Sequence, residues 1–359
     1  MTESNDTAGT SSFVDGVPSF EKERQDAIAE IGDDGYLHHY TDAAGIIGIL
    51  TPATYHTGAH LPEECEQRTI KGDSPVPAGP ANKIEFPCLR ATNVRFLNDH
   101  MELRLVFDLA KDALRAFKTQ SLSLEPDKRK LEVEVIDEAL RAIDDDPQDA
   151  DVYVCSLSAH ANNLSQWRSY GKGIGGYSVG FRMSLLRKLV AMQQGFSIQP
   201  CIYKPNLQRQ AVHEIVHRTI QTLRNQIDSA GPGSDIVSKV FRHFHHASLL
   251  TSLKWIGALM KDQGFEVERE FRLIHIPEHR HGSGQYNPKV QFRPTAIGVA
   301  PFVQFRLKER STDRLQGCQV WVGPSLESGA SEAAIRRFMQ SENIDGDVFP
   351  SSIPYRAMT

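Results

Sequence analysis

Apolar and polar side chains alternate between residues 264 and 274, which is the pattern of a β-strand. One face of that strand would carry Glu266, Glu268, Glu270 and Arg272, and the other would carry Phe265, Val267, Phe271 and Leu273, interrupted by Arg269. The apolar face would pack on a core. The row of carboxylates has two interpretations. It is either a solvated face with an incidental ion pair, or the wall of a cleft in which crowded carboxylates can do chemistry.

The rest of the chain predicts strands and helices in mixed order. Residues 152–157 form a continuous apolar run, typical of a strand buried on both faces. Further strands are expected at 36–41, 84–92, 177–181, 197–203, 289–293, 296–308 and 318–322, and helices at 20–31, 42–50, 98–119, 127–144, 184–193, 206–229, 235–261 and 330–341. This order predicts an α+β fold, with a mixed, largely antiparallel sheet and helical insertions.

The domain organisation follows from composition. Residues 1–19 are rich in Ser, Thr, Gly and Asp and are expected to be disordered. Residues 20–345 are expected to form a single domain, with helical insertions near 100–146 and 206–261, and residues 346–359 a C-terminal tail. Within the domain, residues 58–83 show no periodicity and are expected to form a long excursion of unassigned role.

Composition excludes several classes of protein. The 359 residues carry a formal net charge of −5, which gives no general attraction to nucleic acid. No apolar run reaches the ~18 residues of a membrane span, and the acidic start of the chain does not have the pattern of a signal peptide. The five cysteines, Cys65, Cys88, Cys155, Cys201 and Cys318, are scattered, which argues against a disulfide framework. A cytoplasmic location without a membrane partner is expected.

Familiar cofactor and nucleophile motifs are missing. The glycine-rich run 171–176 has neither Walker nor dinucleotide-binding spacing, and is better explained as a loop that can approach a ligand closely. Six histidines, His243, His245, His246, His275, His279 and His281, lack the spacing of metal ligands. Cys155 in a buried run is typical of a core residue, and Ser156 and Ser158 have no nucleophile-elbow context. No metal is expected.

Two polar or aromatic segments have both structural and functional interpretations. The run His38, His39, Tyr40 and Thr41 on an early strand needs hydrogen-bonding partners, which a ligand or the protein could supply. Trp167 and Tyr170 are three residues apart and could pack one helix face or contact a ligand. Together with the Glu-rich strand near residue 270, these segments indicate a candidate site assembled from distant parts of the chain.

The same segments resemble a family. Leu37–Thr41, Asn98–Glu102, Ser165–Phe181, Glu268–Leu273 and the pair Gly323-Pro324 are similar in order to the motifs of Domain of Unknown Function 2971, over residues 36 to about 325. The chain departs from that pattern at His100, where proline is usual, at Phe265, where tryptophan is common, and in the long segment 58–83.

That family is in turn similar to ADP-ribosyltransferases, and this resemblance implies an ADP-ribosyltransferase-like sheet core with NAD as substrate. By position, His39 matches a strand histidine that binds the adenosine ribose, and Tyr170 or Tyr177 matches an aromatic that stacks on nicotinamide. Glu270 matches the catalytic glutamate and Glu268 the acid before it. Further candidate NAD-binding residues in these motifs are Tyr40, Thr41, Trp167 and Arg272.

The implied chemistry suits these residue types. Loss of nicotinamide leaves an oxocarbenium-like ribose, which a carboxylate stabilises. The resemblance therefore predicts ADP-ribosyl transfer to an unknown acceptor, protein or nucleic acid, by a bacterial toxin or phage-defence effector. An NAD glycohydrolase and a non-catalytic nucleotide- or protein-binding module are the alternatives. If three glutamates share one face, Glu270→Gln should leave stability unchanged or slightly higher, because it relieves repulsion from Glu266 and Glu268.

Overall fold

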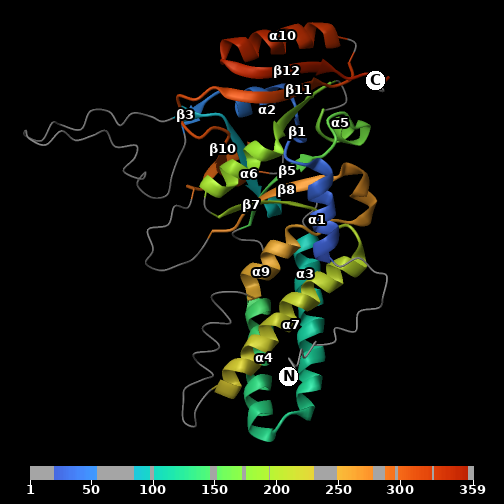
Figure 1. The fold of residues 1–359 in the computed structure, drawn as a ribbon, viewed down its shortest axis with the longest axis vertical. Helices are drawn as coiled ribbons and strands as arrows, with labels where there is room; N and C mark the ends of the chain where they lie inside the picture. Colours follow the sequence, from blue (N-terminus) through green and yellow to red (C-terminus); the bar gives the residue numbers. More distant parts are fainter. Residues whose placement is uncertain are drawn as a thin grey trace, which may run out of the picture.

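The protein, analysed as a computed structural model, is an α+β fold with a mostly antiparallel sheet, as predicted. The structure describes residues 20–54, 85–97, 101–145, 152–171, 175–193, 195–229, 249–277, 288–295, 298–325 and 327–354. The sheet occupies one end of the molecule and a bundle of long helices the other (Figure 1). The predicted N-terminal disorder and the excursion at 58–83 lie outside the described residues.

The elements follow the predicted mixed order. The strands are β1 (Tyr36–Thr41), β2 (Ala53–Thr54), β3 (Glu85–Phe86), β4 (Cys88–Asn93), β5 (Tyr153–Ser158), β6 (Tyr177–Arg182), β7 (Phe196–Pro200), β8 (Glu270–His275), β9 (Gln291–Thr295), β10 (Gly298–Arg306), β11 (Leu315–Val322) and β12 (Ile344–Pro350). The α-helices are α1 (Phe20–Ile31), α2 (Ala43–Leu50), α3 (Met101–Gln120), α4 (Pro126–Asp145), α5 (Leu164–Tyr170), α6 (Met183–Met192), α7 (Pro205–Ser229), α9 (Leu249–Gly257) and α10 (Ser328–Ser341). Short 3-10 turns are η2 (Val94–Phe96), η3 (Ser121–Ser123) and η5 (Gln263–Glu268).

The main sheet divides at β5. Its order is β12-β11-β6-β1-β5-β4-β10-β9, while β8 pairs with β5 and also with β7. All of these pairs are antiparallel except β11 with β12. Along β5, β4 pairs with Tyr153 and Val154, whereas β1 contacts the strand through the single pair His38 and Ser158. The two groups of strands therefore diverge from β5, and the candidate site lies at this point.

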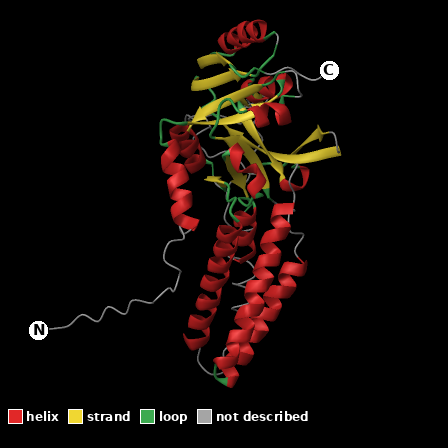
Figure 2. Cartoon of the chain, turned by 90° about the vertical axis from the view of Figure 1, so that its right-hand side faces the viewer, coloured by secondary structure: helices red, strands yellow, loops and turns green. Residues whose placement is uncertain are grey.

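Two hydrophobic cores stabilise the molecule. One is formed by the sheet with α2, α6 and α10, which contribute Ile46, Leu186 and Ile335. The other lies in the bundle of α3, α4, α7 and α9, the helices expected as insertions, which extends away from the sheet (Figure 2). In α3 the buried residues Val106, Phe107, Ala110, Leu114 and Phe117 recur at helical spacing, so one face of the helix packs against its neighbours. Within the described part of the chain, every helix is too short or too polar to span a bilayer.

The strand predicted at 264–274 is wrong in its first half. Asp262 accepts a hydrogen bond from the Gly264 amide at 2.8 Å and caps the 3-10 turn η5. The strand begins only at Glu270, after Arg269 in a left-handed conformation (φ 45°). Phe265 and Val267, expected on the core face, are consequently 42% and 64% exposed. Phe271 and Leu273 are buried as predicted.

Two other boundaries also differ from prediction. The expected C-terminal tail begins inside β12, which pairs in parallel with β11. The helix expected at 235–261 is described only as α9, and it ends at Gly257 so that Ile202 and Met260 can form a β-bridge. Residues 230–248 lie outside the described part. This early end of α9 is important for the site, because it places Lys261 beside η5 and β8.

A buried histidine in β8 is expected to make stability depend on pH. His275 is fully buried against Phe196, with ring centroids 4.7 Å apart, and burial lowers the pKa of its imidazole to about 4. The unfolded chain binds that proton with a pKa near ~6.5. Stability should therefore fall as pH drops through ~6.5 and level off near the folded value, with a loss of about 2 kcal/mol by pH 5.

Urea unfolding of the wild type and of His275→Leu at pH 7.5 and at pH 5 measures this contribution. The variant should lose about 2 kcal/mol less than the wild type between the two conditions. Equal losses in the two proteins would show that His275 does not carry the effect.

Candidate functional site

A small cavity lies where β1, β5 and β8 meet. It is lined by His38, His39, Tyr40, Ser156, Leu157, Ser158, Gln166, Tyr170, Glu268 and Glu270. Its volume of about 30 Å³ is enough for one or two water molecules. His39, Tyr170 and Glu270 all border this cavity, but the His39 side chain lies on the other face of the sheet from Glu270. The expectation that they lie on adjacent strands is wrong, because β5 separates β1 from β8 and Tyr170 ends helix α5.

The register of the strands decides which histidine shares a face with Glu270. His38 is paired with Ser158, and Ser158 is paired with Glu270, so these three side chains share one face of the sheet. The neighbouring His39 points to the other face. There its Nδ1 lies 2.9 Å from the carbonyl oxygen of Ser156 and 3.6 Å from Sγ of Cys155. By register, His38 rather than His39 therefore shares a face of the sheet with Glu270.

His38 borders the cavity with a side chain that is almost completely buried. The residue is 3% exposed, and its ring lies flat against Gly180, where even a Cβ would come within 2.4 Å of it. Burial, with a smaller effect of His160, lowers the pKa of His38 to about 4, so the ring is neutral near pH 7. Within the described residues, Nδ1 is buried without a hydrogen-bond partner. A neutral imidazole in this position can bind a ligand hydroxyl.

Two carboxylates and two cations form a buried cluster at the floor of the site. The Lys261 ammonium bridges the pair, with Nζ 2.5 Å from Oε2 of Glu268 and in contact with Oε2 of Glu270. Arg272 donates from Nε to Oε1 of Glu270 at 2.8 Å. Its NH1 donates to the carbonyl of Ala258 at 2.8 Å. The predicted sharing of one face by Glu270 and Arg272 is thus confirmed.

The two cations determine the protonation of Glu270. Burial alone would raise the pKa of this carboxyl, but the charges of Arg272 and Lys261 outweigh burial and hold the pKa at about 2. Burial acts to lower the pKa of Lys261, and its carboxylate partners Glu270 and Glu268 raise it above the usual value. At neutral pH the site therefore presents a dehydrated, ionised carboxylate at Glu270.

Tyr170 is the aromatic residue placed to contact a ligand. It is 38% exposed and borders the cavity from the end of α5. Trp167, by contrast, is 2% exposed and packs edge-on against Tyr40 with centroids 4.7 Å apart. The Tyr40 hydroxyl donates to the carbonyl of His160 at 2.6 Å and accepts from the Asn163 amide at 2.9 Å. Trp167 and Tyr40 therefore position α5, and their polar atoms are engaged in hydrogen bonds within the protein.

Thr41 and Tyr177 lie away from Glu270. They pair with each other at the ends of β1 and β6, and Tyr177 lines a different cavity of about 280 Å³ beside α2. Gly176 borders this second cavity with φ +128°, a conformation that a side chain would strain. Residues 172–174 of the predicted ligand-approaching loop lie outside the described part.

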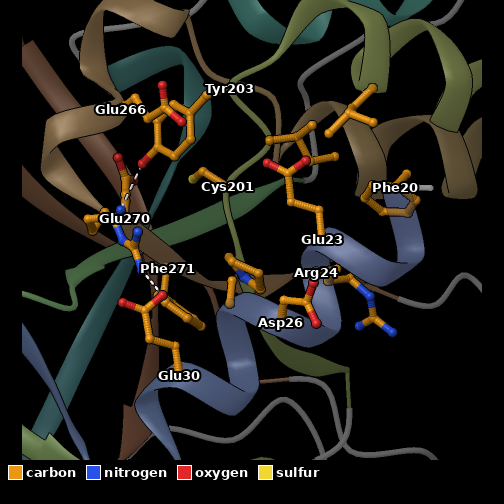
Figure 3. A pocket seen from close by; sticks show the side chains of 15 residues that line it. Phe20, Glu23, Arg24, Asp26, Glu30, Cys201, Tyr203, Glu266, Glu270 and Phe271 are labelled. Atoms are coloured by element: carbon orange, nitrogen blue, oxygen red, sulfur yellow. Dashed lines mark hydrogen bonds and ion pairs between the residues drawn. The ribbon is translucent and has the colours of Figure 1, made fainter. Parts of the chain in front are cut away.

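A third cavity, of about 210 Å³, lies on the other side of residues 269–270, between α1 and β7 (Figure 3). The Tyr203 hydroxyl accepts a hydrogen bond from the Glu270 amide at 2.7 Å, and Arg269 forms an ion pair with Glu30 of α1. Glu266 lines this third cavity and is exposed. Glu270 borders this cavity too, but Glu266 does not lie on a strand with it, contrary to the prediction, because η5 replaces the strand there.

Sequence reasoning missed Lys261 and Tyr203. Lys261 follows the buried run Ala258, Leu259 and Met260, and the structure buries it as well. A lysine that continues an apolar run needs a buried acid as partner, and the acidic segment at 266–270 was the available one. Tyr203 carried no comparable signal, because its hydrogen bond to Glu270 depends on the pairing of β7 with β8.

The histidines give no metal centre in the part of the structure described. No group of three or more His, Cys, Asp or Glu side chains there is arranged to hold a metal ion. His275 lies buried in β8, and the remaining five of the six histidines considered above are outside the described ranges.

The candidate site coincides with a known family segment. Residues 166–273 match the model of the family described as protein of unknown function (DUF2971). The DUF2971 segment begins at Gln166, which lines the cavity, and extends past Arg272, so it contains Tyr170, Glu268 and Glu270. The resemblance is confirmed for these motifs, and the early strand with His38 lies outside the matched segment. No curated protein and no solved structure matches the chain.

Proposed function

We propose that the protein cleaves the nicotinamide–ribose bond of NAD at the Glu270 cavity and transfers ADP-ribose to an acceptor. The observation that supports this most is the meeting of three groups at one cavity: the neutral ring of His38, the partly exposed ring of Tyr170 and the ionised carboxylate of Glu270. They are suited, in turn, to binding a ribose hydroxyl, stacking on nicotinamide and stabilising a developing cation.

Binding a dinucleotide at this cavity requires it to open. Ligand pockets typically have ~300–1,000 Å³, whereas this cavity has about 30 Å³. Tyr170 is the wall that can move at least cost, because it ends a seven-residue helix and is already partly exposed. The opposite wall, formed by β1, β5 and β8, is held by strand pairing. We therefore expect α5 rather than the sheet to be displaced.

In the proposed reaction the carbon–nitrogen bond breaks and its electron pair leaves with nicotinamide. Glu270 remains unprotonated and faces the positive charge that develops at the ribose, so it stabilises the transition state more than the ground state. Glu268 accepts the proton of the acceptor as the new bond to the ribose forms. With water as acceptor, the same steps give an NAD glycohydrolase.

One observation favours the non-catalytic alternative. Both oxygens of the Glu270 carboxylate are already engaged, one by Arg272 and one by Lys261. A carboxylate held in this way could serve only to stabilise the fold around a binding site. Turnover distinguishes the two possibilities, because a binding module retains NAD affinity without releasing nicotinamide.

Release of nicotinamide from NAD by the purified protein tests the proposal. NAD labelled in the adenine moiety, incubated with protein and with nucleic acid as acceptors, separates transfer from hydrolysis. The proposal expects time-dependent nicotinamide release with label on a macromolecule. Nicotinamide release with free ADP-ribose alone would identify a glycohydrolase, and no release with any acceptor would overturn the enzymatic assignment.

Paired histidine variants test which histidine contacts NAD. His38→Phe removes the free ring nitrogen and should weaken NAD binding about tenfold, the effect of losing one net hydrogen bond. His39→Phe removes the contact to the Ser156 carbonyl, so it should lower stability by about 1–3 kcal/mol and leave NAD affinity nearly unchanged. Calorimetric titration with NAD and urea unfolding of both variants measure these effects. If His39→Phe weakens NAD binding more than His38→Phe does, His39 rather than His38 contacts NAD.

A further inference from the structure

Lys261 occupies an unusual position for a lysine. It is buried between η5 and β8, and its ammonium group is the contact that Glu268 and Glu270 share. We propose that Lys261 is a positioning residue for the reaction proposed above: it fixes the carboxylates of Glu268 and Glu270 side by side and keeps that of Glu270 unprotonated. The catalytic part of this inference rests on the proposed function. The effect of Lys261 on the ionisation of Glu270 can be measured without it.

The main chain holds Lys261 in place from two directions. Its amide donates to the carbonyl of Ile202 at 3.0 Å, and its carbonyl accepts from Nε2 of Gln208 in α7 at 3.0 Å. The ammonium group also lies 5.0 Å from the centre of the Phe265 ring. A lysine side chain is normally flexible, so these contacts restrict the ammonium group to the neighbourhood of the carboxylates.

The carboxylates need this ammonium group. Arg272 donates from Nε to Oε1 of Glu270, while the Lys261 ammonium contacts Oε2 of both carboxylates, and Arg272 NH1 donates to the carbonyl of Ala258. Glu268 and Glu270 would repel each other in a buried site if both were ionised without a cation between them. Lys261 removes that repulsion and sets the spacing of the pair, which Arg272 alone does not do.

The other groups around Glu270 do not replace Lys261. Tyr170 and Tyr203 are phenols whose pKa burial raises, so both are neutral at neutral pH. The pKa of His38 is lowered by burial, which leaves that ring neutral as well. The positive charges that contact the Glu270 carboxylate are therefore those of Lys261 and Arg272, and Lys261 also contacts Glu268. The cavity beside α1, which Glu270 also borders, adds the charged residues Glu23, Arg24, Asp26, Glu30, Glu266 and Arg269.

The titration of the Glu270 carboxyl separates positioning from a merely structural role. Full-length protein labelled with ¹³C at the glutamate side-chain carboxyls is titrated by NMR, and the Glu270 signal is assigned by its loss in Glu270→Gln. In the wild type this signal should not titrate down to about pH 4. In Lys261→Met its midpoint should rise from about 2 into the measured range, to about pH 4–5, which is the upper part of the ~1–3 unit shift expected when an adjacent opposite charge is removed.

Two further variants control the experiment. Lys118→Met removes a surface lysine that pairs with Asp137, and it should leave the Glu270 signal unchanged. Lys261→Arg retains the charge and should restore the wild-type titration. If Lys261→Met does not fold, Lys261→Gln is measured in its place, because glutamine can still hydrogen-bond within the cluster. A Glu270 signal that remains untitrated in the neutral variant would overturn the proposal.

Catalysis provides a second readout. If the wild type releases nicotinamide, the acid limb of the kcat/KM profile should shift to higher pH in Lys261→Met, by the same number of pH units as the NMR midpoint. In Lys261→Arg the acid limb should return to its wild-type position. A lower rate with an unchanged pH profile would mean that Lys261 is structural only. If the wild type releases no nicotinamide while the NMR midpoint moves, the proposed function fails and the control of ionisation by Lys261 stands.

Discussion

Glu270→Gln is expected to slow nicotinamide release by about a hundred- to a thousandfold, the usual effect of losing one preorganised electrostatic contact. Glutamine has nearly the same size and can still hydrogen-bond, but it has no charge to oppose the cation that develops on the ribose. NAD affinity should change much less, because the ribose carbon carries little positive charge in the ground state. The loss should therefore appear mainly in kcat.

The same substitution should lower stability by about 3 kcal/mol. The pKa of Glu270 is held at about 2, below the usual ~4.3, and this depression corresponds to roughly that free energy above the unfolded pKa. This stabilising contribution is lost as the pH falls from the pKa of Glu270 in the unfolded chain to its pKa in the folded protein. The structure thus reverses the expectation of unchanged or higher stability, because Glu266 is exposed on η5, and Lys261 and Arg272 neutralise the charge of Glu270.

Glu266→Gln is the matched control, since it makes the same chemical change on exposed η5. It should alter stability by less than about 0.5 kcal/mol and leave nicotinamide release unchanged. Thermal unfolding and nicotinamide release are measured on the same preparation of each variant. A Glu270→Gln protein that is destabilised but fully active would end the catalytic assignment, while retaining the structural one.

Arg272→Met should cost about 3–5 kcal/mol of stability, more than any surface substitution. Arg272 was predicted as an NAD-binding residue, but its guanidinium is buried and committed to Glu270 and the Ala258 carbonyl. Removing it leaves Glu270 with one cation in place of two, and it leaves a buried carbonyl without this partner. In the reaction proposed above, we therefore expect Arg272 to act through Glu270.

Arg269→Met provides the comparison for Arg272, because Arg269 pairs with Glu30 at a largely exposed position and should contribute about 0–1 kcal/mol. Urea unfolding of both variants at pH 7.5 gives the two values. If Arg272→Met lies within about 1 kcal/mol of the wild type, the buried cluster does not stabilise the fold as described here.

Local patterns predicted most of the elements. The apolar run of β5, the amphipathic face of α3 and the polar strand β1 are properties of short stretches of sequence, and they form as expected. The alternation at 264–274 misled because Asp262 caps a 3-10 turn and strand partners are available only from Glu270 onward. Alternation shows that a strand is possible, but pairing decides where it begins.

The site was predictable in its parts but not in its orientation. The segments containing His38, Tyr170 and Glu270 could be identified from residue types and resemblance. Which of two adjacent histidines faces Glu270 depends on the single pair between His38 and Ser158, which joins residues 120 positions apart. A shift of one residue in the register of a strand turns every side chain of that strand to the other face of the sheet. The local sequence pattern therefore does not show which histidine faces Glu270. Lys261 was overlooked because its partners are fixed by the early end of α9.

A crystal structure of the wild type with an NAD analogue tests the central claim most directly. Replacing the oxygen of the nicotinamide ribose ring by a methylene group prevents an oxocarbenium ion from forming, so the analogue stays intact. The account predicts that α5 is displaced, the nicotinamide ring lies against Tyr170, the ribose hydroxyls reach His38, and the ribose carbon faces Glu270. An analogue bound in the Tyr177 cavity or beside α1, with the Glu270 cavity still closed, would contradict it.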